Sequence, residues 1–526
     1  MGGAAAFAAV NGARALSPDR LAALDRPSHA TPNYWCSWGM QGELVRQKNL
    51  DVNHLMPAFP GDQGFSPHIR DVITDDMVLG NGGWAETLWP EIRSDLFFLL
   101  DDGWDVPYGA DQHKDISPFG SMDLDRVKFA GLKGTPGQRL AQLTQGLQDK
   151  GWRGLGLWVS PGCQCELLKK TKKEDWAARR EEWKRKLAWC AEGGVGYLKV
   201  DWGTRNGVDF RRMLSGLKDE IAPHIVMEHC VVQGPLNGAV KNPDGTVRIT
   251  PRRIGCAFKS ELKIIEMTRE LLAFSDVYRI YDMLGGSVLD AQAIERTALS
   301  LKLGEDVGNH ALVQVEDTPY LGAVLGCSMG FFRNSGAEGL RAIRWQRLVP
   351  AFRSSDSNRV AYSETALENK ILLTNHWYKP ILGKVVAQAA PATVSRGMPL
   401  PEVTKLEAEL PYVCAARHPN GALSVGIYAR AIEPNKSFFP PADVRLAVPF
   451  DLDTPLGVFG RPHAVTVDCA ARPGSVRVFA QDLAGSMPKD ITTTVRFEGG
   501  RLTIPGSALE SVQTKPGHPA TLVYLA

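Results

Sequence analysis

Lys199 and Asp201 are the residues whose types and spacing point most directly to chemistry. They close the short apolar run 197–201, and because strand side chains alternate with a period of two, both would point to the same side. A helix-like run over 183–190 and a glycine pair at 193–194 precede this strand. A helix followed by an apolar strand that ends in charge is how a (β/α) barrel presents catalytic groups. A structural ion pair is the alternative interpretation.

Charged side chains also end other apolar runs of the sequence. Asp101 and Asp102 follow one such run, Glu228 ends another, and Arg279 and Asp282 close a third. The C-terminal ends of barrel strands face one common mouth, so these groups would converge there. Two adjacent carboxylates are electrostatically costly, and they suit either a metal ion or the hydroxyls of a sugar.

Three functions fit a mouth lined by acids with one lysine and one arginine. A retaining glycosidase places two carboxyls about 5 Å apart, one as nucleophile and the other as general acid/base. A metal-dependent lyase or racemase of the enolase type uses several acids to hold magnesium and a lysine as base. A barrel that binds sugar without turnover is the third hypothesis. Loss of activity when a chelator removes metal ions would favour the lyase or racemase. Sugar that binds and stays intact would favour the barrel that only binds sugar.

Short apolar strands alternate with amphipathic helical runs between about residues 32 and 355. The predicted strands are 34–38, 96–100, 155–159, 197–200, 225–227, 277–281, 311–315 and 323–329, and the predicted helices include 136–150, 176–190, 210–220, 260–273 and 291–303. This rhythm predicts an α/β fold, a (β/α)8 TIM barrel. A doubly wound sheet is the alternative, but the glycine-rich phosphate-binding turn that often accompanies it is absent after the first strand.

After about residue 363 the helical pattern fades and alternating strands take over. The strands expected there are 422–429, 444–448, 475–480, 492–497, 501–504 and 521–524, with a hairpin turn at 498–500. They predict a C-terminal antiparallel all-β sandwich domain that supports the barrel. The predicted domains are therefore a leader over 1–30, a catalytic barrel over 31–360 and the β-sandwich over 361–526.

Length and charge limit the classes of partner. At 526 residues the chain is too long for one ordinary domain. Its net charge is only +2, and the sequence shows no cluster of basic residues of the kind that binds nucleic acid. No stretch approaches the ~20 apolar residues needed to span a bilayer. We expect neither nucleic acid nor a membrane as partner, and the oligomeric state stays open.

The cysteines and the N-terminus bear on the compartment. The nine cysteines form no zinc pattern, and their odd number argues against a complete disulfide framework, so we expect mostly free thiols and at most one bridge. The apolar run 4–10 and the Ala-Arg-Ala at 13–15 resemble the remnant of a signal peptide, which predicts a secreted or periplasmic protein. A disordered alanine-rich leader, compatible with the cytoplasm, is the alternative.

Five motifs, in order along the barrel, resemble glycoside hydrolase family 27, the α-galactosidase and α-N-acetylgalactosaminidase family related to family 36 in clan D. They are Trp35-Cys36-Ser37-Trp38, Asp101-Asp102-Gly103-Trp104, Gly154 to Trp158, Tyr197 to Asp201, and Tyr278 to Asp282. The resemblance implies a retaining, exo-acting hydrolase that releases terminal α-linked galactose without a metal ion or cofactor. A related activity on an α-N-acetylgalactosaminide, a β-L-arabinopyranoside or an isomalto-type glucoside is the alternative.

The resemblance also implies a role for each matching residue. Asp201 would be the nucleophile and Asp282 the acid/base, with the pKa of Asp282 raised when substrate excludes water. Lys199 would favour the ionised form of Asp201. The residues that would bind substrate are Trp38, Asp101, Asp102, Trp158, Lys199, Glu228 and Arg279. Within this set the two aspartates would accept hydrogen bonds from the 4- and 6-hydroxyls, the tryptophans would wall the pocket, and the last two residues would lie near the 2-position.

Some positions depart from the family pattern. Arg279 and Asp282 are three positions apart where four is more usual, so Asp276 is a rival for the acid/base. Trp202-Gly203 and His229-Cys230 also differ, which indicates a divergent branch with a different sugar or linkage. We interpret His229 as a core or supporting histidine. The acidic pair Glu316-Asp317 could line the mouth, but we favour a solvated acidic loop.

Overall fold

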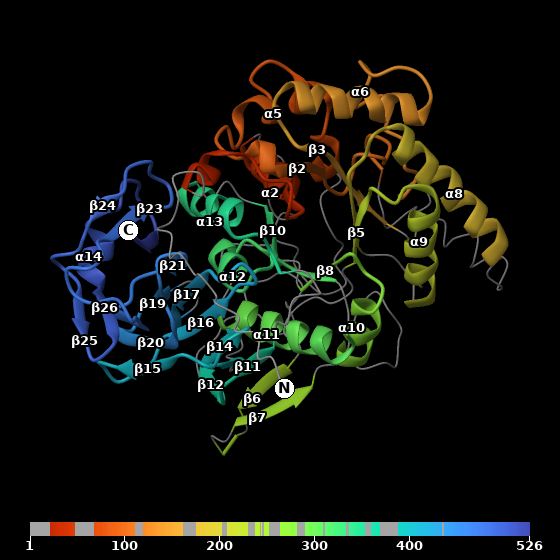
Figure 1. Ribbon diagram of the computed structural model, residues 1–526. Helices are drawn as coiled ribbons and strands as arrows, with labels where there is room; N and C mark the ends of the chain where they lie inside the picture. The colour runs from red at the N-terminus through yellow and green to blue at the C-terminus, as the bar shows by residue number, and fades with distance from the viewer. Residues whose placement is uncertain are drawn as a thin grey trace, which may run out of the picture.

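A closed barrel of parallel strands forms the centre of the molecule. The computed structural model describes residues 21–47, 68–110, 119–160, 175–201, 208–229, 237–241, 243–244, 247–251, 264–280, 290–308, 311–332, 336–352, 359–368, 388–433 and 436–526. Within these residues eight strands close in the order β1-β10-β9-β8-β5-β4-β3-β2 (Figure 1). Every neighbouring pair is parallel, so the (β/α)8 barrel is confirmed and a doubly wound sheet is excluded.

The barrel strands lie close to the runs expected from the sequence. Their bounds are β1 (Asn33–Cys36), β2 (Leu96–Leu100), β3 (Gly154–Val159), β4 (Tyr197–Val200), β5 (Val226–His229), β8 (Val277–Arg279), β9 (Leu312–Glu316) and β10 (Ser328–Phe331). The main helices of the barrel are α2 (Trp38–Gln47), α6 (Pro136–Asp149), α8 (Trp176–Glu192), α9 (Val208–Ile221), α10 (Ile264–Leu272), α11 (Asp290–Asp306), α12 (Pro319–Val324) and α13 (Ala337–Leu348). Shorter helical turns are η1 (Ala23–Asp25), α3 (His68–Asp71), α4 (Asp75–Leu79), α5 (Trp84–Thr87) and η3 (Arg93–Asp95).

One expected barrel strand was wrong, and in the β-domain the strand expected over 492–497 is the shorter β25 (Arg496–Glu498), preceded by a turn. The apolar run 323–329 was predicted as a single strand, but its first residues belong to α12 and only its end belongs to β10. Pro319 starts the helix, where a missing N–H costs nothing, and Gly326 has a φ of 62° that breaks the chain direction between helix and strand. Continuous apolar runs fit a buried helix and a buried strand equally well, so composition alone could not separate them.

Alternation along the strands separates two packing environments. Trp35, Phe98 and Leu198 lie in the large hydrophobic core that the strands share with the helices. Tyr34 and Tyr197, their neighbours along the chain, belong to a separate cluster on the other side of the sheet, inside the barrel. Because the sequence period is two, the same alternation carries the charged residues at the strand ends into the barrel mouth.

The C-terminal residues form two further sheets that enclose a core of their own. An eight-stranded sheet is built of β11 (Val360–Tyr362), β14 (Thr393–Arg396), β16 (Tyr412–Arg417), β17 (Leu423–Tyr428), β21 (Leu456–Phe459), β27 (Ala520–Leu525), β23 (Val478–Asp482) and β24 (Lys489–Asp490). The five-stranded sheet contains β15 (Glu402–Lys405), β20 (Ala442–Pro449), β22 (Ala464–Asp468), β26 (Arg501–Pro505) and β25 (Arg496–Glu498), and α14 (Gly506–Glu510) follows it along the chain. Aliphatic side chains from both sheets make up one buried cluster, so the expected β-domain is confirmed.

Local details of the β-domain follow from its sequence. The hairpin of β25 and β26 turns at Gly499 and Gly500, whose φ angles of 57° and 74° favour glycine. Most strand pairs are antiparallel, whereas β14–β16, β17–β21 and β20–β22 are parallel. Smaller two-stranded pairs are β12 (Thr365–Glu368) with β13 (Gln388–Pro391) and β18 (Arg430–Glu433) with β19 (Lys436–Phe438).

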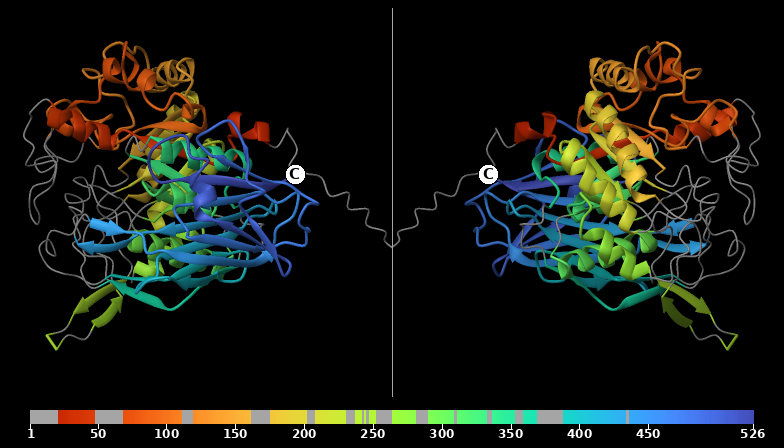
Figure 2. Two further views of the ribbon diagram at one scale, coloured as in Figure 1. Left: turned by 90° about the vertical axis from the view of Figure 1, so that its left-hand side faces the viewer. Right: turned by 90° about the vertical axis from the view of Figure 1, so that its right-hand side faces the viewer.

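The hairpin of β6 (Asn237–Lys241) and β7 (Val247–Pro251) projects from the barrel (Figure 2).

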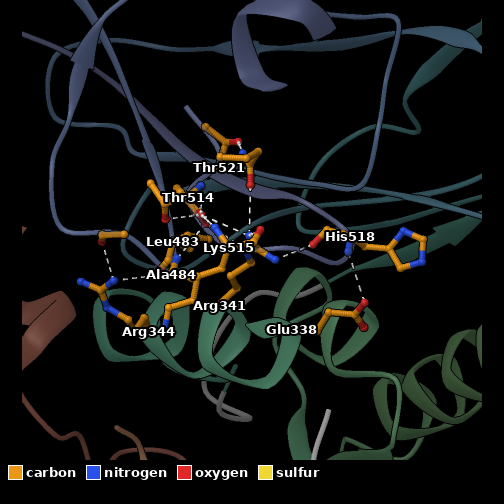
Figure 3. Close-up of polar contacts among 12 residues, drawn as sticks. Glu338, Arg341, Arg344, Leu483, Ala484, Thr514, Lys515, His518 and Thr521 are labelled. Atoms are coloured by element: carbon orange, nitrogen blue, oxygen red, sulfur yellow. Dashed lines mark hydrogen bonds and ion pairs between the residues drawn. The ribbon is translucent and has the colours of Figure 1, made fainter. Parts of the chain in front are cut away.

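Helix α13 joins the barrel to the β-domain through arginines. Arg341 donates to both carboxylate oxygens of Asp482, at 2.8 and 3.1 Å, and also to the backbone carbonyls of 515, 516 and 518 (Figure 3). One turn later, Arg344 donates to the carbonyls of Leu483 and Gly485. Because these residues are mostly buried, the interface is a hydrogen-bonded clamp rather than a loose contact.

Replacing Asp482 with asparagine should destabilise the whole protein. Burial alone would raise the pKa of Asp482, but Arg341 and the backbone N–H groups of Ala484 and Thr514 lower it to about 2. Since the folded-state pKa lies below the unfolded value, this stabilisation, about 2 kcal/mol, exists above pH ~4 and is lost as the pH falls toward 2. Asp482→Asn should therefore lower the free energy of unfolding at pH 7 by about 3–5 kcal/mol, because Arg341 keeps no anionic partner there.

The measurement is denaturant unfolding at pH 7 and pH 3, with Glu402→Gln as the control. Glu402 pairs with Arg445 at 2.7 Å in the same domain, but both side chains are partly exposed, so its loss should cost at most about 1 kcal/mol. Equal losses from the two substitutions, or a loss for Asp482→Asn that does not shrink at pH 3, would contradict the clamp.

The described residues test the remaining predictions about cysteines, membrane spans and the N-terminus only in part. Cys36, Cys190, Cys327, Cys414 and Cys469 are free buried thiols. None of the helices in the described part of the chain is long and apolar enough to cross a bilayer. Residues 1–20 of the predicted leader, the other four cysteines, Trp202-Gly203 and Asp282 lie outside the described residues. The end of the predicted leader, 21–30, is described and contains η1, in which Leu24 is buried.

Candidate active site

Charged side chains meet inside the barrel at the C-terminal ends of five strands. The acids are Asp101, Asp201, Glu228 and Glu316, and the bases are Lys199 and Arg279. Each of the six is at most 5% exposed. The parallel register of neighbouring strands brings such residues together. For example, Lys199 on β4 lies beside Trp158 on β3 and beside Glu228 on β5. Buried charges persist only when they are paired, and the contacts below show how.

Asp201 directly follows β4 and continues its ladder, since its backbone N–H donates to the carbonyl of Val159 at 2.9 Å. Oδ2 of its carboxylate accepts from Arg279 Nη2 at 2.8 Å and from Trp158 Nε1 at 3.2 Å, and Lys199 Nζ lies 4.0 Å away. Among the described residues no group donates to Oδ1. One oxygen of this carboxylate is therefore anchored and the other is available.

The surroundings of Asp201 keep it ionised. Burial by itself raises the pKa of this carboxyl, but the charges of Arg279 and Lys199, with the hydrogen bonds from Arg279 and Trp158, hold the pKa below its ordinary value. An ionised carboxylate with one free oxygen is the form that a carboxylate nucleophile requires.

Lys199 is held chiefly by Asp101 rather than by Asp201. Its ammonium lies 2.7 Å from Asp101 Oδ2 and 3.9 Å from Glu316 Oε1. Burial and Arg279 favour the neutral amine, but Asp101, Cys36 and Glu316 raise the pKa of Lys199 well above its ordinary value. The lysine is thus a permanent cation, whereas the base of a proton-abstracting barrel lyase must be a neutral amine.

Arg279 is fully buried and contacts three carboxylates. Besides its bond to Asp201, Nε lies 3.1 Å from Glu228 Oε1 and Nη1 lies 3.2 Å from both oxygens of Glu316. The planar guanidinium suits such multiple pairing. The expectation that Arg279 and Glu228 lie near a sugar 2-position stays a prediction, since both side chains are 0% exposed.

Two tyrosines complete the coordination of the buried glutamates. Tyr197 donates to Glu228 Oε2 at 2.6 Å, and Tyr34 donates to Glu316 Oε1 at 2.5 Å. Burial and the neighbouring glutamates raise the pKa of both tyrosines well above the ordinary value, so both remain donors. Burial also raises the pKa of Glu228, against the opposing charge of Arg279.

Asp101 and Asp102 follow β2 and carry different partners. Asp101 Oδ2 accepts from Lys199 and from the Cys36 thiol at 2.9 Å, and its Oδ1 accepts from the backbone N–H of Asp102 at 2.8 Å. Asp102 instead forms a bidentate pair with Arg70, at 2.9 and 2.6 Å. The predicted pair of carboxylates is thus present at the mouth, each with its own cation.

The two predicted tryptophans lie close to this charged group. Trp38 starts α2 and Trp158 is the second-last residue of β3, and both belong to the hydrophobic cluster on the inner side of the barrel. They are only 8% and 1% exposed. Trp158 also binds the Asp201 carboxylate, a contact that sequence reasoning did not predict.

Asp276, the rival for the acid/base, lies at the opposite end of the barrel. It precedes β8, accepts from the backbone N–H of Met227 at 2.8 Å and pairs with Lys218 at 2.8 Å. The N-terminal ends of barrel strands face away from the mouth, so Asp276 cannot share a substrate with Asp201.

Asp282 itself lies outside the described residues, but the chain approaches it from the mouth side. Strand β8 ends at Arg279, and the next backbone N–H, that of Ile280, still donates to the carbonyl of Gln314 at 3.2 Å. Asp282 follows two residues later, so its role stays a prediction.

Glu316 was misinterpreted from the sequence. The acidic pair with Asp317 suggested a solvated loop, but Glu316 is the last residue of β9, is 0% exposed and binds Tyr34 and Arg279. The period of two along β9 places Gln314 and Glu316 on one side, a signal that could have identified it. Arg70 gave no such signal, because it lies far from any barrel strand in the sequence.

His229 behaves as the expected supporting residue. Its ring is fully buried, with Nδ1 facing Arg211 at 3.2 Å and Nε2 facing Ser215 at 2.8 Å. Burial and the positive charge of Arg211 lower the pKa of His229 well below its ordinary value, so the ring is neutral. Arg211 also donates to the backbone carbonyl of Asp201 and so supports the C-terminal end of β4. No group of three or more metal-ligating side chains occurs among the residues that the structure describes.

Comparisons with known proteins give only distant likenesses. No protein-family model and no curated protein matches the chain. One similar solved structure, from Bacillus halodurans, is called a putative α-N-acetylgalactosaminidase; it is 11% identical, with a TM-score of 0.33 over 70% of this chain and 94% of that chain. Another is a Paenibacillus polymyxa xyloglucanase of glycoside hydrolase family 44 with xyloglucan, 10% identical, with a TM-score of 0.18 over 90% of this chain and 72% of that chain. Likenesses this distant leave the activity to be argued from the site itself.

Proposed function

We propose that this protein is a retaining exo-glycosidase that releases a terminal α-linked galactose or a close relative, with Asp201 as nucleophile. The observation that carries the proposal is the state of Asp201. It is an ionised carboxylate at a barrel mouth, anchored through Oδ2 by Arg279 and Trp158, and no group in the described part of the chain donates to its Oδ1.

In the first step Oδ1 of Asp201 attacks the anomeric carbon and forms a glycosyl ester, while an acid protonates the departing glycosidic oxygen. Water then attacks the same carbon, the same acid acts as base, and the ester bond to Asp201 breaks with overall retention. The transition states carry positive charge on the sugar ring, which the surrounding acids Asp101, Asp102 and Glu316 favour electrostatically.

Asp282 is the residue we assign to the acid/base role. It follows β8, whose last residue, Arg279, contacts Asp201, whereas Asp276 precedes β8 at the other end of the barrel and pairs with Lys218. Asp101 and Asp102, tied to Lys199 and Arg70, suit hydroxyl recognition rather than proton transfer. The substrate is therefore a sugar with several hydroxyls facing acids.

The direct test is hydrolysis of three p-nitrophenyl glycosides, the α-galactoside, the β-L-arabinopyranoside and the α-N-acetylgalactosaminide. Turnover of at least one is expected, and proton NMR of the first product should show retained anomeric configuration. Inverted product would exclude Asp201 as a covalent nucleophile. No turnover of any of the three, with no effect of the substitution Asp201→Asn on any other glycoside, would overturn the proposal.

Replacing Trp158 with phenylalanine should impair catalysis through Asp201. The change keeps the aromatic wall but removes the N–H that bonds Oδ2, so kcat should fall by roughly 10-fold. It should also raise the pKa of Asp201, because a bond to the charged form is lost, so the acid limb of the pH profile moves to higher pH. An increase in KM alone, with an unshifted acid limb, would instead indicate a wall residue only.

A further inference from the structure

Arg70 and Asp102 form a buried, bidentate ion pair beside the mouth. Nε and Nη2 of the guanidinium lie 2.9 and 2.6 Å from the two carboxylate oxygens, and both residues are 2% exposed. The pair joins α3 to the turn after β2, two segments that are 32 positions apart in the chain. A parallel pairing of two N–H groups with two oxygens fixes the orientation of a carboxylate as well as its charge.

Several contacts hold Arg70 in place from the backbone side. Gly103 has a φ of 120°, and a Cβ there would lie 2.7 Å from the Cβ of Arg70, so only glycine permits this approach. Lys128 Nζ donates to the carbonyls of both Arg70 and Gly103. Gln41 Nε2 bridges the carbonyls of Ile69 and Asp102 at 2.9 and 3.1 Å. Arg70 is therefore a fixed support rather than a mobile surface arginine.

The hydrogen-bonding capacity left to the two aspartates differs. An ionised carboxylate has about four acceptor sites. Asp101 already accepts three bonds, from Lys199, Cys36 and the N–H of Asp102. The described contacts of Asp102 are the two from Arg70. More acceptor capacity therefore remains on Asp102 than on Asp101.

We infer that Arg70 is a positioning residue that makes Asp102 the principal acceptor of substrate hydroxyls. The inference rests on the proposed function and specifies which acid of the pair recognises the sugar and what orients it. Arg70 itself need not touch substrate, because it acts through the two oxygens that it holds. The expected ligand is a sugar whose 4- or 6-hydroxyl faces Asp102.

Loss of Arg70 should leave a distinctive pH dependence. Burial, Asp101 and Asp201 all raise the pKa of Asp102, and Arg70 is the cation that opposes them. Without Arg70 the carboxyl should stay protonated to higher pH and accept hydroxyls well only after ionisation. The kcat/KM of Arg70→Met should therefore rise with pH where that of the wild type is flat, and the double variant Arg70→Met/Asp102→Asn should lose this rise.

The experiment compares wild type, Arg70→Met and Arg70→Lys on p-nitrophenyl α-galactoside and its 4-deoxy and 6-deoxy analogues. We expect Arg70→Met to raise KM about 10- to 100-fold on the full sugar, with a smaller change in kcat and a smaller penalty on the deoxy analogue that lacks the recognised hydroxyl. Arg70→Lys, which keeps the charge but not the fork, should be intermediate. If Arg70→Met does not fold, Arg70→Lys is compared with the wild type on the same three sugars.

The matched control is Arg347→Met, which removes a similar buried arginine–aspartate pair, to Asp95, before the other end of β2. It should lower stability without changing the ranking of the three sugars. Equal penalties of the Arg70 variants on all three sugars would overturn the inference, even with an active wild type. An inactive wild type would instead overturn the proposed function on which the inference rests.

Discussion

Replacing Asp201 with asparagine should reduce kcat on the preferred glycoside on the order of 10⁴-fold or more, because the variant cannot form the glycosyl ester. The amide keeps the size of the side chain and can still accept from Arg279 and Trp158, so folding should be little changed. Kinetics with an activated aryl glycoside, together with a thermal unfolding curve, measure both quantities. Added azide should restore part of the activity and give a glycosyl azide of inverted configuration.

The control is Asp276→Asn, the same chemical change at the opposite end of the barrel. That residue pairs with Lys218 and is partly exposed, so we expect activity near that of the wild type. A fluorinated glycoside that slows the second step should add one sugar to the peptide that contains Asp201, detected by mass spectrometry. A sugar found on another residue, or full activity of Asp201→Asn, would refute the assignment.

Replacing Arg279 with methionine should lower the free energy of unfolding by about 3–5 kcal/mol at pH 7, because it leaves buried carboxylates without their shared partner. Asp201, Glu228 and Glu316 all contact this guanidinium, and the side chain is fully buried. In the variant the folded-state pKa values of Asp201 and Glu228, which burial raises, should lie above the unfolded values because the opposing charge of Arg279 is gone. Such groups take up protons on folding, so stability should be greater at pH 5 than at pH 8. Denaturant unfolding at the two pH values measures the difference.

Arg211→Met provides the matched control for Arg279. Arg211 is equally buried, and within the described residues it donates to the carbonyls of Val200 and Asp201 and faces the ring of His229. Its loss should cost stability without the same pH dependence. If both variants show the same dependence on pH, the destabilisation comes from lost packing, and the charge argument for Arg279 is wrong.

Strand positions followed from local sequence with good accuracy. Residues 96–100 and 197–200 were predicted as strands and are strands, because the period of two, the apolar composition and the flanking glycine are properties of consecutive residues. The same period correctly put Lys199 and Asp201 on one side of β4. The run 323–329 failed for the opposite reason, since an apolar stretch without polar alternation fits helix and strand alike.

Contacts between distant segments were not predictable in this way. Asp201 was expected to depend on its neighbour Lys199, but Arg279 and Trp158 bind it directly, and Lys199 pairs mainly with Asp101. The partner of each charge depends on barrel register, which sets which strand ends lie side by side. A single sequence contains no record of that register.

The sequence by itself determined the alternation of strands and helices, the change to an all-β domain, and the delivery of acids to strand ends, because each depends on a short local pattern. Only the tertiary structure decided that Arg279 and Trp158 bind one oxygen of Asp201, that Glu316 is buried, that Asp276 lies at the opposite end of the barrel, and that Arg70 pairs with Asp102. Those facts depend on closing the barrel and on burial, which determine the partner and the pKa of each charge.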